Sequence, residues 1–436
     1  MQHVARKVAV ISTVSIMASY AFSTQYNAGA RSTNSVVAAS ALPDIDRLID
    51  ATARQVALTP TSSSLDLLAR LQLSRGRITG DAASYAAAET AASESTKIAP
   101  LNREARTIDA EVRYANHDFH GARTRAASIV ALDPKELGAL GVEGDAAREQ
   151  GAYGLASKIL ADLDAIAPHV PSITVRRARF AYLSGDSKLA ADLATRAERQ
   201  AQNSGTLGMT QAFYPSFRGQ VALDSGDYQE AATQFRNALK LADGDRVASL
   251  GLAKTLAAQG KQRAAVKILR ALTDRYPDPA ALTLLGDLLQ TTGDKTGAEN
   301  SYALVEAVAG LAKANRQIYN RELVLFYANH DRKLGEALRL ARAEIVDRKD
   351  VYGYDALAWA EFKSGHLAEA GIAATKAASL GTRDATMKYH AGMIAAAVGD
   401  TVKAKALLTD AISISPHFDV RQAPIARTTL DRLGTS

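Results

Sequence analysis

A spacing of 34 residues constrains the fold of this chain more than any other feature. Alanine occurs at this spacing four times in the first half of the chain, at Ala88, Ala122, Ala156 and Ala190. The same slot continues, with less regular steps, at Ala231, Ala265, Ala298, Ala337, Ala370 and Ala404. A period of this length is typical of helix hairpins, which bury their apolar faces only by stacking on neighbouring hairpins.

Two further series of residues, which we also call ladders, recur at fixed offsets from these alanines. Glycine or alanine lies about twelve residues before the alanine slot, at Ala110, Gly144, Ala178, Gly219, Ala253, Gly286, Ala358 and Gly392. Proline lies about twelve residues after it, at Pro100, Pro134, Pro168, Pro277 and Pro416. Small residues allow helices to cross closely, and proline ends a helix because it has no amide hydrogen to donate. Each period therefore predicts two helices that cross at small residues.

The three ladders resemble the tetratricopeptide repeat over residues 64–416. The resemblance implies an all-α fold, an α-α superhelix (a right-handed solenoid) of about ten helix hairpins. We expect a spacer and a capping helix in residues 31–63, the latter at Pro43–Leu58, and a second capping helix in residues 417–436. Gln202, Asp243 and Thr382 replace proline in three units. The step from Ala190 to Ala231 is longer than 34 residues, which predicts a loop and a possible bend near 202–210.

Residues 1–30 have the pattern of an export signal. Arg6 and Lys7 precede the apolar run Val8–Phe22, and small residues follow at Ala28-Gly29-Ala30, with Ala21-Phe22-Ser23 as a rival cleavage site. The run is short for a membrane-spanning helix, so a short N-terminal anchor is the alternative. The alternative to both a signal and an anchor is a disordered or buried N-terminus without a targeting role. The pattern favours an extracytoplasmic location: secreted, periplasmic or cell-envelope associated.

The word YANHD occurs twice, at Tyr114–Asp118 and Tyr327–Asp331, and each copy falls where other units carry a hairpin turn such as Gly185-Asp186. Asparagine, aspartate and histidine tolerate the left-handed backbone of such turns better than most residues. We therefore interpret both copies as turns. His117 and His120 offer two imidazoles but no third ligand, so we expect no metal site.

Composition excludes several classes of chemistry. The chain has no cysteine, which rules out disulfides, thiolate zinc sites and a cysteine nucleophile. The net charge is +6, but acidic and basic residues are interspersed, and we expect no nucleic-acid partner. No catalytic or phosphate-binding motif is found, and the repeats leave no segment long enough for a catalytic domain. We expect no enzyme activity and no cofactor.

In tetratricopeptide proteins the residue after the Gly/Ala crossing point faces a concave groove, and the resemblance implies the same here. The matching residues are Glu111, Asp145, Arg179, Gln220, Lys254, Asp287, Trp359 and Met393. Neighbouring positions on this face carry Tyr114, Arg148, Tyr182, Phe362, Asp355 and Tyr389. The early units thus present charge of both signs. Trp359, Phe362, Tyr389 and Met393 could form an aromatic patch that binds a partner. Trp359 could equally pack between helices.

These observations predict a non-enzymatic protein-binding scaffold of the bacterial cell envelope, which holds a protein or peptide in the groove. An accessory subunit of a polymer-export, secretion or envelope-assembly complex is the alternative, and an enzyme built on the repeats is the third possibility. Membrane association is expected only through an uncleaved N-terminal segment or through a partner complex. The segments YANHDFHGA and DALAWAEFKSGHLAEA resemble exported bacterial multi-repeat proteins of unassigned activity. That resemblance supports the location and a bacterial source.

Overall fold

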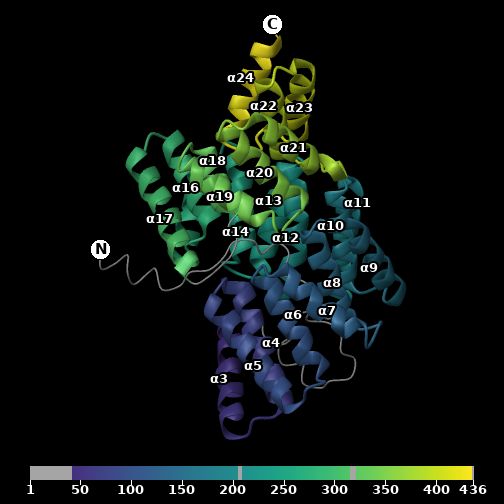
Figure 1. Cartoon of the computed structure of the whole chain (residues 1–436). Coiled ribbons are helices and arrows are strands. Elements are labelled where there is room, and N and C mark those ends of the chain that lie inside the picture. The colour runs from purple at the N-terminus through teal and green to yellow at the C-terminus, as the bar shows by residue number, and fades with distance from the viewer. Residues whose placement is uncertain (1–41, 205–208, 315–320, 435–436) are drawn as a thin grey trace. The chain divides into compact units, whose positions relative to one another are not determined.

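The computed structural model describes residues 42–204, 209–314 and 321–434, and in these ranges every regular element is helical (Figure 1). The predicted all-α class is confirmed. The export signal of residues 1–30 and all but the end of the spacer lie outside the described residues, as do residues 205–208 of the predicted bend.

Twenty helices, α4 to α23, follow one another as ten consecutive pairs, the number of hairpins that the ladders predict. The first helices of the pairs are α4 (Ser62–Thr79), α6 (Arg103–Ala115), α8 (Leu137–Glu149), α10 (Pro171–Leu183), α12 (Met209–Asp224), α14 (Arg246–Ala258), α16 (Pro279–Thr291), α18 (Arg321–Asn329), α20 (Val351–Lys363) and α22 (Ala385–Ala397). The second helices are α5 (Ala82–Ile98), α7 (Phe119–Val130), α9 (Tyr153–Ile166), α11 (Ser187–Asn203), α13 (Tyr228–Leu241), α15 (Gln262–Arg275), α17 (Lys295–Ala314), α19 (Leu334–Glu344), α21 (Leu367–Ala377) and α23 (Thr401–Ile414). Helices α3 (Leu42–Leu58) and α24 (Gln422–Gly434) flank them, where capping helices are predicted.

Glycines in the left-handed conformation make most of the hairpin turns. Positive φ angles occur at Gly151, Gly185, Gly226, Gly260, Gly293, Gly365 and Gly399. The residue after the glycine often caps the second helix: Oδ1 of Asp400 accepts a hydrogen bond from the amide of Lys403 at 3.1 Å. A glycine followed by an aspartate therefore both reverses the chain and starts the next helix.

The small-residue ladder lies at the helix crossings. A Cβ atom built on Gly219 would lie 3.0 Å from the ring of Phe235, and one on Gly392 would lie 2.9 Å from the side chain of Leu408. The alanine ladder is buried in every unit, from Ala88 to Ala404. The crossings thus have no room for a larger side chain.

The chain divides into two compact units. Unit 1 comprises residues 1–178, 193–215 and 237–247, and unit 2 comprises residues 179–192, 216–236 and 248–436. In unit 1, α3 packs on α4 through Ile45, Ile49 and Leu71. In unit 2, one apolar cluster joins Trp359, Tyr389, Leu408 and Ala426 from α20, α22, α23 and α24.

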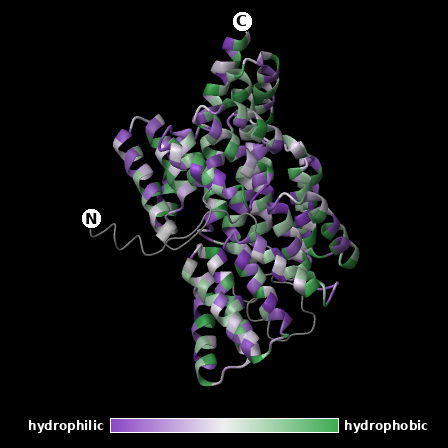
Figure 2. Cartoon of the chain, viewed as in Figure 1, coloured by the Kyte–Doolittle hydropathy of each residue, from purple (hydrophilic) through white to green (hydrophobic). Residues whose placement is uncertain are grey.

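Polar and apolar residues are interspersed along the helices of both units (Figure 2). Among the described residues, no helix has both the length and the apolar character needed to cross a membrane.

Candidate functional site

The two YANHD copies make turns in different ways. In the first copy, His117 adopts the left-handed conformation with φ of 64°, and Asp118 caps α7 by accepting from the amide of Gly121 at 2.8 Å. In the second copy, Asp331 takes that conformation with φ of 53°. The interpretation as turns is confirmed, and the second copy leaves the imidazole of His330 available for other contacts.

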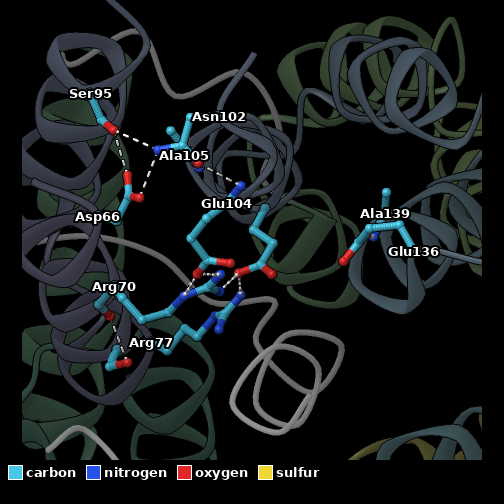
Figure 3. A network of polar contacts seen from close by, with 11 residues as sticks. Asp66, Arg70, Arg77, Ser95, Asn102, Glu104, Ala105, Glu136 and Ala139 are labelled. Carbon is cyan, nitrogen blue, oxygen red and sulfur yellow. Dashed lines mark hydrogen bonds and ion pairs between the residues drawn. The ribbon is translucent and has the colours of Figure 1, made fainter. Parts of the chain in front are cut away.

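In unit 1, the charged side chains of the first helices pair with one another (Figure 3). Glu111 on α6 accepts hydrogen bonds from Arg70 at 2.8 Å and from Arg77 at 3.0 Å, both on α4. Glu104 accepts a further bond from Nε of Arg70 at 3.0 Å. Burial opposes the charged form of Arg70, but Glu111 and Glu104 outweigh it and raise the pKa of this guanidinium.

The next first helices of unit 1 repeat this pairing. Nε of Arg176 donates to Asp145 at 3.0 Å, and Arg148 donates to Glu149 at 2.9 Å and to the hydroxyl of Tyr114 at 3.1 Å. Each network therefore pairs two arginines with two acidic residues of the first helices. Glu111 and Asp145, two of the residues expected to present charge in the groove, are both buried.

In unit 2, the structure brings the four residues of the predicted aromatic patch together. The ring of Trp359 lies 5.1 Å from that of Phe362 and 5.6 Å from that of Tyr389, and Met393 packs on the same cluster. Trp359 is only 3% exposed and Tyr389 only 2%, so this cluster is covered. Phe418 contributes to that cover, with its ring 5.6 Å from that of Tyr389.

A chain of hydrogen bonds continues from the aromatic cluster. The indole Nε1 of Trp359 donates to Oδ1 of Asn329 at 2.7 Å, and Nε2 of Gln422 donates to the same oxygen at 2.7 Å. His390 stacks on Trp359 with ring centres 4.2 Å apart. Its Nδ1 lies 2.9 Å from the carboxylate of Asp355, and its Nε2 lies 3.4 Å from Nε2 of Gln422.

A second polar cluster forms around Asp287 on α16. Its Oδ1 accepts from the hydroxyl of Tyr302 at 2.8 Å and lies 2.8 Å from Nε2 of His330. Nη1 of Arg421 lies 3.7 Å from the same oxygen, which is an ion pair without a short hydrogen bond. Burial and the charge of Asp287 raise the pKa of Tyr302.

Both clusters meet the same piece of chain, residues 416–422, which comprises most of the connection after α23 and the first residue of α24, Gln422. We call this piece the 416–422 segment, and we call six residues of the two clusters, on helices from α16 to α22, the docking face. The docking face consists of Asp287, Asn329, Asp355, Trp359, Tyr389 and His390. The amide of His417 in addition donates to the hydroxyl of Tyr228, on α13, at 2.9 Å.

The remaining predicted groove residues of unit 2 make other contacts. The guanidinium of Arg179 is 5.6 Å from the ring centre of Phe217, and this arginine is buried. Gln220 donates to the carboxylate of Asp224 at 2.7 Å. Lys254 is exposed. A role of the eight predicted groove residues in binding stays a prediction; the structure adds that Lys254 is the exposed member among them.

Sequence reasoning missed Asn329, His330, His390, Arg421 and Gln422. Two of them stand in the repeated YANHD word, whose second copy carries Asn329 and His330. His390 follows Tyr389 directly, and that adjacency is the only local signal for it. Nothing near Arg421 or Gln422 in the sequence points to helices about a hundred residues away.

The described residues contain no group of three or more acidic, histidine or cysteine side chains placed to hold a metal ion. The polar groups of the docking face have hydrogen-bond partners among the described residues.

Comparison with known proteins gives one family match. Residues 222–288, which include α13, α14 and α15, match the family model described as tetratricopeptide repeat. No curated protein shows a significant sequence match to this chain.

Several solved structures are similar to the chain. Yeast Tom70 is 11% identical with a TM-score of 0.40, over 90% of this chain and 93% of that one. A thermophilic TPR protein of Thermus thermophilus is 19% identical with a TM-score of 0.36, over 49% of this chain and 99% of that one. PilW, a type IV pilus biogenesis factor, is 17% identical with a TM-score of 0.40, over 46% of this chain and 91% of that one. At these scores the likenesses carry no conclusion about partners. The matched segment and the recurring hairpin show that this chain carries tetratricopeptide repeats.

Proposed function

We propose that this chain is a non-enzymatic scaffold that binds a protein partner through the first-helix side of unit 2. Tetratricopeptide repeats are protein-interaction modules. The observation that carries the proposal is that the docking face already holds a piece of polypeptide from outside the hairpins, the 416–422 segment, which ends at the first residue of α24. It does so with an aromatic contact to Tyr389 and a side-chain hydrogen bond to Asn329.

Unit 1 supports this assignment to unit 2. The acids Glu111 and Asp145 of its first helices are buried and paired with arginines. Charges that neutralise one another inside a unit offer little to a partner, because a partner would have to break a buried ion pair. The first-helix side of unit 2 keeps the exposed Lys254 and the aromatic cluster.

Site-specific photo-cross-linking tests the proposal without disturbing the fold. A photoreactive amino acid at Lys254, on a first helix, should capture a discrete partner in an extract of the source cells. The same amino acid at Lys403, which is exposed on the second helix α23, is the matched control. Equal capture at the two positions, or capture at neither, contradicts the proposal.

We further propose that the scaffold works outside the cytoplasm, which the basic start at Arg6 and Lys7 and the apolar run Val8–Phe22 support. N-terminal sequencing of the mature protein should find a start near Ser23 or Arg31. A mature chain that retains residues 1–22 in a soluble fraction contradicts export. Co-sedimentation of the processed chain with membranes would favour the alternative role, an accessory subunit of an envelope complex.

A further inference from the structure

We infer that the 416–422 segment is a built-in stand-in for the partner. The partner would be a peptide that carries an aromatic residue followed, three and four residues later, by two basic residues. This inference rests on the proposed function and deepens it. It starts from the chemistry that the docking face offers at the position of Gln422.

The hydrogen-bond donors next to Asn329 and His390 determine which atoms of these two side chains face Gln422. An indole nitrogen can only donate, so Oδ1 of Asn329 faces Trp359. The carboxylate of Asp355 accepts from Nδ1 of His390, and in the neutral imidazole with its proton on Nδ1, the form assigned here, Nε2 is an acceptor. Two acceptors, Oδ1 of Asn329 and Nε2 of His390, therefore converge on the side-chain nitrogen of Gln422.

Only one of the two polar atoms of the Gln422 side chain has a hydrogen-bond partner at this site. Its Nε2 meets the two acceptors, but its Oε1 is buried and accepts no hydrogen bond from any described residue. A buried acceptor without a hydrogen-bond donor destabilises the folded state. A basic side chain would bring donors alone to the two acceptors and would leave no orphaned carbonyl.

The neighbouring position already carries a basic side chain, Arg421, which contacts Tyr302 as well as Asp287. The guanidinium of Arg421 stops 3.7 Å from Asp287, beyond hydrogen-bond distance, and the Arg421 side chain is one-third exposed. A peptide that is free of the connection to α24 could shorten this contact. Asp287 gives this position a carboxylate, which complements a basic side chain.

The aromatic position completes the recognition pattern. Phe418 packs against the cluster of Trp359, Tyr389, Phe362 and Met393, three residues before Arg421. The segment thus has an aromatic residue, then two intervening residues, then an arginine and a glutamine. The preferred partner has the same pattern, but with lysine or arginine in place of the glutamine.

The test uses the full chain and its single tryptophan, Trp359, as the reporter. The probe is a ten-residue peptide of the sequence 414–423 carrying Gln422→Lys. The reference peptides are the unchanged sequence and the Lys-bearing peptide that also carries Phe418→Ala. Binding is followed by Trp359 fluorescence and independently by calorimetry.

Two protein variants make the outcome specific. In Phe418→Ala/Gln422→Ala the built-in segment is weakened, and Ile425→Ala, an exposed position on α24, is the matched control. Circular dichroism establishes that each keeps its helices. We expect the Lys-bearing peptide to bind the double variant at least tenfold more tightly than it binds the wild type or Ile425→Ala, because the competing segment no longer occupies the face.

The same peptide should bind at least tenfold more tightly than either reference peptide. Equal affinity for the three peptides, or equal affinity of the three proteins, overturns the inference. If that happens while Lys254 still captures a partner in the photo-cross-linking experiment, the proposed function stands and the stand-in role is wrong. If Lys254 captures nothing, the proposed function fails instead.

Discussion

Single glycines at helix crossings decide how closely the two helices of a hairpin can pack. Gly219 on α12 faces the ring of Phe235, which is fully buried, with 3.0 Å between that ring and an added Cβ. We expect Gly219→Ala to destabilise the protein by about 1–3 kcal/mol, because the added methyl group must displace a buried ring. Chemical denaturation followed by circular dichroism measures the change.

Gly371 on α21 is the matched control for that substitution. No atom lies within 4 Å of an added Cβ at this position. Gly371→Ala should therefore stabilise the protein by about 0.5–1 kcal/mol, since alanine favours the helix more than glycine does. If Gly219→Ala also raised the free energy of unfolding, the helices at Gly219 would be packed less closely than described, which would contradict the prediction.

The buried ion pairs of unit 1 make a second prediction at this scale. Glu111→Gln leaves Arg70 and Arg77 buried without the carboxylate that both contact. We expect a loss of about 3–5 kcal/mol in the free energy of unfolding. Glu94→Gln breaks the exposed pair with Lys97 and should cost less than about 1 kcal/mol. Comparable losses in the two variants contradict the network in Figure 3.

At the scale of helices, the contact of α10 and α12 with α20 and α22 contains two carboxyl groups that oppose each other. Asp224 on α12 accepts from the hydroxyl of Tyr182, on α10, at 2.9 Å and from Gln220 at 2.7 Å. Burial and then the charge of Asp384, which precedes α22, raise the pKa of Asp224 to about 7, while Lys254 opposes the shift. Burial also raises the pKa of Asp384 and of Tyr352, on α20.

The sign of the pH dependence follows from this raised pKa. In the unfolded chain Asp224 ionises near its ordinary pKa of 3.8, and in the folded chain near 7. Stability contributed by the protonated carboxyl is therefore lost as the pH rises from about 4 to about 7. Asp224→Asn stays neutral, so its stability relative to the wild type should rise by on the order of 1–2 kcal/mol between pH 5 and pH 8, since partial exposure screens part of the shift.

Thermal melts of both proteins at the two pH values measure this difference, with Asp410→Asn, an exposed carboxyl on α23, as the control. A stability difference that stays constant between pH 5 and pH 8 would mean that Asp224 is ionised in the folded protein throughout.

The elements themselves could be predicted because their signals are local. The roles of a left-handed turn residue such as Gly226 and of a crossing residue such as Gly219 depend only on residues of the same hairpin. The ladders therefore predicted ten hairpins and their turns. The contact between Gln422 and Asn329 joins residues 93 positions apart, and no periodic signal encodes it. The contacts of Phe418 and Gln422 around Trp359 were missed for that reason. The cluster of Trp359 with Phe362, Tyr389 and Met393 and the packing of Trp359 between helices were the two alternatives that the sequence predicted.

At the scale of the whole molecule, the central claim is that the 416–422 segment lies on the docking face of unit 2. The claim gives the repeats a bound polypeptide of known sequence, on which the proposed partner chemistry rests. It depends on one shared acceptor, Oδ1 of Asn329, to which Trp359 and Gln422 both donate at 2.7 Å.

Nuclear magnetic resonance on the perdeuterated full chain tests that claim most directly. The single tryptophan gives one indole N–H signal. Each donated hydrogen lies about 1.9 Å from the shared oxygen, so the two hydrogens are less than about 4 Å apart. We predict a nuclear Overhauser cross-peak between the Trp359 indole hydrogen and one side-chain amide pair, and its loss in Gln422→Met. An indole signal with no amide cross-peak in the wild type would contradict the claim.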